Sequence, residues 1–156
     1  MLKPEYKNSF IKYKLIEHLS DVGIKVCGNN IIELFENAAE GMFSLITDLN
    51  NVKKIIEKEI LIHIEEKIEI EDFLIAWLEK LLYLCETEGI IFSYFKIKDF
   101  RVNDRQSSIL ALIEGERINL KKHEMLSQIK APTYHNLHIH KENNKGGYIV
   151  EIIFDV

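Results

Sequence analysis

Two segments with helical spacing interrupt a chain whose other apolar residues follow strand spacing, and this order constrains the fold more than any other feature. The apolar positions of residues 31–46 recur every three or four residues, as do those of residues 72–86. Asn30 is placed to cap the first segment, and Gly89 is placed to end the second. The sequence therefore predicts two amphipathic helices, each with a buried stripe.

Strand-like alternation fills most of the remaining chain. The predicted strands are residues 10–17, 22–27, 59–64, 90–102, 108–115, 125–131, 133–141 and 148–154. The acidic residues 65–72 are expected to form a solvated strand end or loop. Since helices do not alternate one for one with strands, the pattern disfavours a doubly wound parallel sheet. The predicted class is α+β: a mostly antiparallel or mixed sheet with two amphipathic helices packed on one face, in a single compact domain.

Composition narrows the class of protein. The 156 residues are 47% hydrophobic and 29% charged, with a net charge of −5. The acidic balance argues against direct, stable nucleic-acid binding, which needs a basic face. No apolar run reaches the roughly 20 residues of a membrane span, and the polar start is not a signal peptide. Cys27 and Cys85 lack metal or redox spacing and are expected to be structural thiols. A cytoplasmic protein is expected.

Residues 17–23 combine His18, Ser20 and Asp21 in one short segment. A catalytic triad is a spatial arrangement, and adjacency in sequence does not supply it. The simpler interpretation is a turn in which Asp21 accepts hydrogen bonds from nearby backbone N–H groups.

A second cluster places three histidines within residues 130–140. On a strand, His135 would point inward as a core histidine, while His138 and His140 would share the opposite face. Two exposed histidines are the commoner outcome for such a pair, although the spacing also suits two metal ligands.

The third cluster is the last two residues, where the Asp155 carboxylate is followed by the terminal carboxylate of Val156. Two adjacent anions need water, a basic side chain or a cation beside them. A hard cation such as Ca²⁺, Mg²⁺ or Mn²⁺ takes six or more oxygen ligands, so two carboxylates are too few. Asp21, on a turn at a strand end, is a candidate for the third.

Several segments, taken in order, resemble those of archease proteins. The segment Glu17-His18-Leu19-Ser20-Asp21-Val22-Gly23 resembles the family's Glu-His-Thr-Ala-Asp-[Ile/Val]-Gly opening. The other matching segments are residues 34–43, 77–84, 122–124, 130–135 and 154–156. Leu19, Ser20 and Pro132 depart from the usual pattern. The resemblance runs from about residue 13 to 156, which makes residues 1–12 an expected N-terminal extension of an archease-like domain over 1–156.

The resemblance implies a compact α+β fold and a role as an accessory protein that is not itself an enzyme. Archeases assist the GTP-dependent RNA ligase that joins 3′-phosphate or 2′,3′-cyclic-phosphate ends to 5′-hydroxyl ends in tRNA splicing and RNA repair. They promote guanylylation of the ligase and multiple turnover. The resemblance also implies a divalent cation near Asp21, Asp155 and Val156, with calcium expected and magnesium or manganese as alternatives.

Two other interpretations stay open from the residues themselves. An independent metal-dependent hydrolase could use Asp21, Asp155 and His135. A general folding chaperone would need an exposed apolar patch, which no feature of the sequence demands.

Overall fold

The computed structural model describes residues 11–17, 20–142 and 146–156. Its elements, in chain order, are β1 (Tyr13–Glu17), β2 (Val22–Gly28), α1 (Ile31–Ile46), the 3₁₀ turn η2 (Leu49–Asn51), β3 (Ile56–Ile64), α2 (Ile70–Glu88), β4 (Ile90–Val102), β5 (Ser107–Arg117), β6 (Ala131–Pro132), β7 (His140–Lys141) and β8 (Tyr148–Asp155). Neither described helix is both long enough and apolar enough to cross a membrane.

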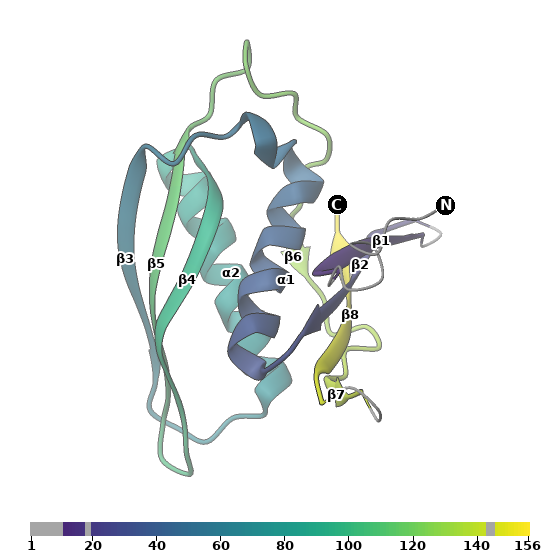
Figure 1. The fold of residues 1–156 in the computed structure, drawn as a ribbon, viewed down its shortest axis with the longest axis vertical. Helices are drawn as coiled ribbons and strands as arrows, with labels where there is room; N and C mark the ends of the chain where they lie inside the picture. Colours follow the sequence, from purple (N-terminus) through teal and green to yellow (C-terminus); the bar gives the residue numbers. More distant parts are fainter. Residues whose placement is uncertain (1–10, 18–19, 143–145) are drawn as a thin grey trace, which may run out of the picture.

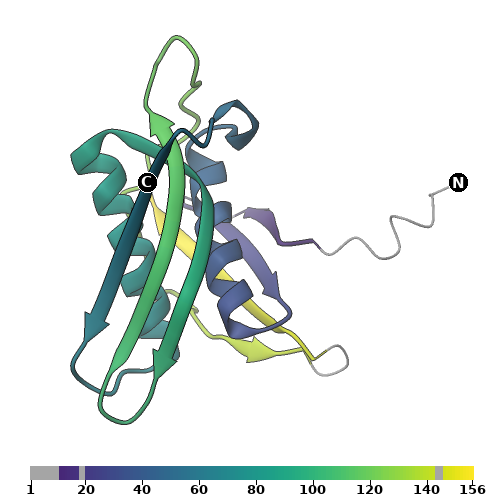
Figure 2. The ribbon, with the colours of Figure 1, turned by 60° about the vertical axis from the view of Figure 1, so that its left-hand side comes forward.

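The strands form two antiparallel sheets, and both helices lie between them (Figure 1). One sheet has the order β3-β5-β4, and the other has the order β1-β2-β8-β6 with β7 also paired to β8. Figure 2 brings the three-stranded sheet toward the viewer, with the helices behind it. The predicted α+β class, antiparallel pairing and compact single domain are confirmed. Both helices cover one face of the three-stranded sheet as predicted, and the feature that the prediction lacked is a second sheet on their other side.

Helix α1 shows the consequence of this three-layer arrangement. Its buried positions extend beyond the predicted stripe to Asn37, which is 4% exposed, and to Gly41. The Asn37 side chain donates a hydrogen bond of 2.8 Å to the backbone oxygen of Cys27 in β2. On the other side, Glu36 accepts a hydrogen bond from the backbone N–H of Ile97 in β4. The helix is therefore tied to both sheets.

The predicted caps Asn30 and Gly89 are confirmed, whereas the second helix is longer than the predicted residues 72–86. The Asn30 side chain accepts a hydrogen bond of 2.8 Å from the backbone N–H of Glu33. Gly89 follows α2 with φ of 65°, the left-handed conformation that glycine adopts without strain. Helix α2 begins at Ile70, so the last part of the acidic segment 65–72 is its first turn.

Residues 118–141 differ most from prediction, since only β6 and β7 replace two long predicted strands. The backbone of the loop before β6 bonds to the end of α1, with the Leu126 N–H donating to Ile46 O. After β6 the chain turns, because Leu137 N–H donates to Tyr134 O and Asn136 has φ of 53°. A residue in this left-handed conformation cannot continue a strand. The segment Asn143-Asn144-Lys145-Gly146-Gly147 has the composition of a hairpin connection, but residues 143–145 lie outside the described residues.

Cys27 and Cys85 are not joined in a disulfide, and Cys27 is half-buried on β2. Cys85 is buried on α2, and burial raises the pKa of its thiol to about 11. The thiol therefore stays protonated and unreactive at neutral pH.

Candidate metal centre

The ends of β2 and β8 bring the two predicted aspartates to the same edge of a sheet. These strands pair antiparallel, with Val22 opposite Phe154. Continuing that register by one residue places Asp21 opposite Asp155. On the other side of β8, Ala131 of β6 pairs with Asp155. Residues far apart in the sequence thus converge because three strands meet there.

The backbone of Asp155 is held firmly while its side chain faces solvent. The Lys130 N–H donates a hydrogen bond of 2.8 Å to the Asp155 backbone oxygen. The Asp155 side chain is exposed, Asp21 is half-buried, and Val156 is 38% exposed. A rigid backbone with carboxylates at its end offers oxygen donors at fixed positions.

The donor chemistry of this edge suits a hard cation, because carboxylate oxygens are the ligands that calcium and magnesium prefer. Within the described part of the chain, no three or more His, Cys, Asp and Glu side chains form a group that could hold a metal ion. The predicted ligand set contains only two carboxylate side chains, those of Asp21 and Asp155. Its third carboxylate is the chain terminus at Val156, which is not a side chain. A cation here would complete its shell with water or with groups of a partner.

His135 does not take the inward position predicted for it. Its side chain is exposed, its backbone N–H lies 3.4 Å from Thr133 Oγ1, and its Nε2 lies 3.4 Å from the Asn136 amide. The prediction of a core histidine is wrong because residues 134–137 form a turn instead of a strand. These contacts give no support to a hydrolase that combines His135 with Asp21 and Asp155.

His138 and His140 are both exposed, the commoner of the two predicted outcomes. Their rings lie edge to face with centroids 4.8 Å apart, and His138 Nδ1 lies 3.7 Å from Glu71 Oε1 at the start of α2. In the first cluster, His18 and Leu19 lie outside the described residues, so only Ser20 and Asp21 can be placed.

A buried polar network that periodicity did not predict lies where β5 leads into the next loop. His123 is 1% exposed and Glu116 is 9% exposed. The Asn119 N–H donates to His123 Nδ1 at 3.0 Å, so Nε2 carries the proton and donates to Glu116 Oε1 at 2.9 Å. Glu116 also accepts hydrogen bonds from the Lys122 ammonium and from the Lys53 backbone N–H. In the sequence, this network was indicated only by the segment Lys122-His123-Glu124, which is one of the segments that resemble the archease family.

The network makes stability depend on pH. Burial alone raises the pKa of Glu116, but hydrogen bonds from Lys122, the Lys53 backbone and His123 together lower it to about 2. Its unfolded pKa is about 4.3, so the stabilisation is complete above that pH and is lost as pH falls toward 2. We expect Glu116→Gln to cost roughly 2–3 kcal/mol at pH 7 and about half as much near pH 3.

Urea unfolding at both pH values measures this effect. Glu114→Gln, a charge removal two residues away on the same strand, is the matched control. Equal costs of Glu116→Gln at the two pH values would contradict the assignment.

The match to known proteins covers almost the whole described chain. A model of the Archease protein family (MTH1598/TM1083) matches residues 13–156. This chain belongs to the archease family. Protein archease of Methanosarcina mazei is 34% identical over 145 residues, which cover 93% of this chain and 96% of the relative. Protein archease of Saccharolobus islandicus is 36% identical over 144 residues, which cover 92% and 98%.

A solved archease-like structure has the same fold. The solution structure of Methanobacterium thermoautotrophicum protein 1598 matches with a TM-score of 0.77 and 30% identity, over 93% of this chain and 99% of that one. The three-layer arrangement is therefore shared with an archease-family relative.

Proposed function

We propose that this archease is an accessory protein that activates a GTP-dependent RNA ligase, promoting ligase guanylylation and multiple turnover in tRNA splicing and RNA repair. The observation that carries the proposal is the convergence of Asp21 and Asp155 at one sheet edge of an archease fold. Membership of the archease family supports an accessory role, and His135, the third residue of the alternative hydrolase site, lies on an exposed turn.

The proposed site holds one divalent cation through Asp21, Asp155 and the terminal carboxylate of Val156. Calcium is the expected ion, with magnesium or manganese as alternatives, since all three take oxygen ligands. A bound cation would supply positive charge that orients phosphate groups of the ligase's nucleotide. The chain's own part is to present the carboxylates on a rigid strand end, where the Lys130 backbone fixes Asp155.

The charge of the protein fits this encounter. With a net charge of −5, it is attracted to the positively charged cleft in which a ligase binds nucleotide and RNA. Long-range attraction of this kind raises the association rate at low salt more than it raises affinity.

Ligase turnover with Asp155→Asn tests the proposal. The substitution keeps the size of the side chain and removes its charge, so we expect multiple-turnover ligation to fall to the level seen without the archease. Glu151→Gln, an exposed charge removal elsewhere on β8, is the matched control and should stimulate normally.

A folded Asp155→Asn protein with full stimulation would disprove the site. In a parallel assay, the pure protein is incubated with nucleotides and phosphoesters without ligase. Turnover there would favour the hydrolase instead.

A further inference from the structure

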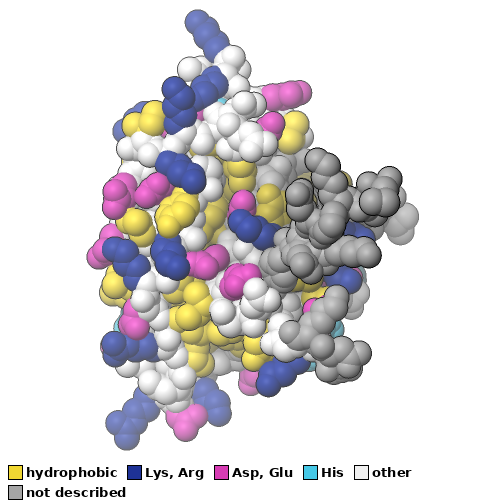
Figure 3. Space-filling view, viewed as in Figure 1, with side chains coloured by type: hydrophobic (Ala, Val, Ile, Leu, Met, Phe, Trp, Pro, Cys, Tyr) yellow, Lys and Arg dark blue, Asp and Glu magenta, His cyan; other side chains and the backbone are white. Residues whose placement is uncertain are grey.

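The loop after β5 borders an open hollow of about 780 Å³ at one end of the molecule. The hollow lies between this loop and the segment that enters β3. In Figure 3, Lys and Arg side chains gather at the upper end of the molecule, where Figure 1 places this loop. The described lining of the hollow comes from residues 55–56 and 116–122.

The lining exposes apolar side chains to an unusual degree. Leu120 is 77% exposed and Ile55 is 67% exposed, and these are the two most exposed large apolar side chains among the described residues. Both border the same hollow. Large apolar side chains gathered at one exposed site are typical of a surface that another molecule covers.

The accessible charge of the hollow is positive, although the whole protein is acidic. Arg117, Lys121 and Lys122 line the hollow and are exposed, whereas the ammonium of Lys54, just before the opposite wall, lies over the Tyr94 ring. Among the described residues of the lining, the acidic one is Glu116, which is buried against Lys122 and His123. The hollow therefore favours an anionic partner.

The buried network fixes the shape of both walls. Glu116 accepts from the Lys53 backbone on one wall and from Lys122 on the other. Asn119 O accepts from the N–H groups of Lys122 and His123, at 2.9 and 2.7 Å. The walls are therefore arranged before any partner binds, and this reduces the entropy lost on binding.

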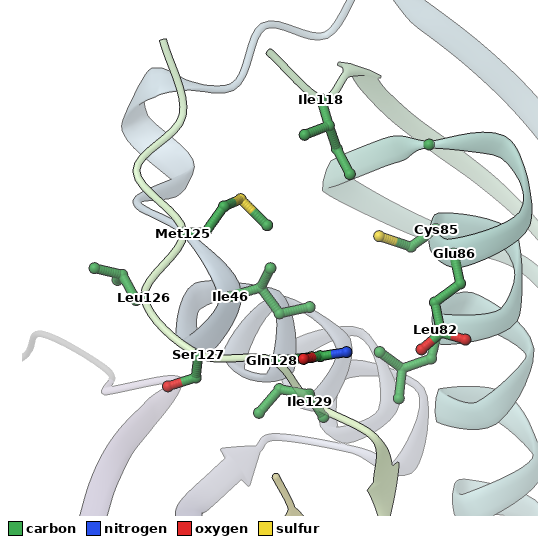
Figure 4. Close-up of a pocket in the computed structure, with 11 residues that line it drawn as sticks. Ile46, Leu82, Cys85, Glu86, Ile118, Met125, Leu126, Ser127, Gln128 and Ile129 are labelled. Atoms are coloured by element: carbon green, nitrogen blue, oxygen red, sulfur yellow. The ribbon is translucent and has the colours of Figure 1, made fainter. Parts of the chain in front are cut away.

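An apolar pocket of about 490 Å³ adjoins the hollow, and Ile118 borders both. It lies between the carboxyl ends of the two helices and residues 125–129. Figure 4 shows Ile118, Met125 and the Cys85 sulfur pointing into it, with Ile46 and Leu82 below. A volume of this size accommodates apolar side chains of a bound segment.

From these features we propose that the hollow and the adjoining pocket are a docking surface for a protein segment that carries acidic residues beside apolar ones. The proposal rests on the proposed function, and the segment belongs to the ligase, outside its RNA-binding cleft. Acidic side chains of the segment pair with Arg117 and Lys121, while its apolar side chains cover Leu120 and Ile55 and enter the pocket.

RNA fits this surface less well than a protein does. Proteins that bind single-stranded RNA stack bases on aromatic side chains. Among the described residues that line the hollow, none is aromatic. Exposed leucine and isoleucine side chains make no favourable apolar contact with phosphate groups, whereas they can pack against apolar side chains in a protein interface.

Binding of the cognate ligase to the double variant Leu120→Ser/Lys121→Glu tests the proposal. We expect the Kd to rise at least about tenfold, since the change removes an apolar contact and reverses a charge at the interface. Stimulation should return to the wild-type level at saturating variant, because the metal centre is intact. The variant Leu61→Ser/Lys96→Glu makes the same chemical change at exposed positions of β3 and β4 and should bind normally.

The outcomes separate this inference from the proposed function. An unchanged Kd for the hollow variant, with wild-type protein binding and stimulating the ligase, overturns the docking surface alone. A wild-type protein that neither binds nor stimulates the ligase overturns both. Binding of a short single-stranded RNA without ligase, weakened in the hollow variant but not in the control, assigns the surface to RNA and overturns the protein partner.

Discussion

Replacing Trp77 by alanine is expected to lower the free energy of unfolding by about 3–5 kcal/mol. Trp77 is fully buried on α2, and its indole N–H donates a hydrogen bond of 2.9 Å to the Phe35 backbone oxygen on α1. The truncation would leave a cavity in the middle layer, between helices that both sheets cover. Such a loss is a large share of the 5–15 kcal/mol that typically stabilises a domain. Urea unfolding followed by circular dichroism measures it.

Two variants separate the contributions of Trp77. Trp77→Phe keeps an aromatic ring but removes the donor, and we expect a cost of about 1–3 kcal/mol. Tyr83→Ala removes an aromatic side chain that is 59% exposed on the same helix, and it should cost less than about 1 kcal/mol. If Trp77→Ala costs no more than Tyr83→Ala, the indole is not an anchor of the core.

Replacing Asp21 by asparagine is expected to weaken divalent-cation binding by at least about tenfold, since the affinity of such sites depends on the number of charged ligands. Isothermal titration calorimetry with Ca²⁺, repeated with Mn²⁺ and Mg²⁺, measures the affinity and identifies the preferred ion. Ligand binding to the folded state also raises the melting temperature, and this rise should be smaller in the variant.

Asp104→Asn is the matched control for the metal centre, because its side chain is 91% exposed in the hairpin between β4 and β5. It removes the same charge without touching the site, so its affinity should equal that of the wild type. Unaltered binding in the Asp21→Asn protein would remove Asp21 from the ligand set. A wild-type protein without saturable binding would disprove the metal centre as a whole.

The helices illustrate what local pattern predicts well. Asn30 and Gly89 act within one turn of the residues they cap, so a single stretch of sequence contains the whole interaction. The hairpin between β4 and β5 is equally local, since Asn103 Oδ1 accepts hydrogen bonds from the N–H groups of Arg105 and Gln106.

The candidate metal centre depends on more than local pattern. Charge and strand periodicity showed only that Asp155 and Val156 form an unusual anionic end. Asp21 was one candidate for a third ligand, and the family resemblance supported it. Its place opposite Asp155 depends on the pairing of strands that are more than 100 residues apart, and periodicity cannot specify that pairing.

His135 and the Glu116–His123 network are features that residue periodicity cannot predict. The strand predicted around His135 failed because Asn136 adopts a left-handed conformation that no apolar alternation reveals. The burial of His123 depends on hydrogen bonds from residues of its own loop and on a carboxylate at the end of β5. A buried histidine whose two ring nitrogens are both hydrogen-bonded in a loop cannot be recognised from the spacing of residues in the sequence.

By itself, the sequence determined the class of fold, the positions and caps of both helices, and the family. These depend on spacing and on contacts within a few residues, or on a set of ordered motifs. Only the tertiary structure decided that two sheets enclose the helices, that Asp21 and Asp155 come to the same end of a strand pair, and that a cationic hollow lies beside exposed leucine and isoleucine. These features arise from long-range strand pairing and from the burial of both sides of each helix, which depend on the whole chain at once.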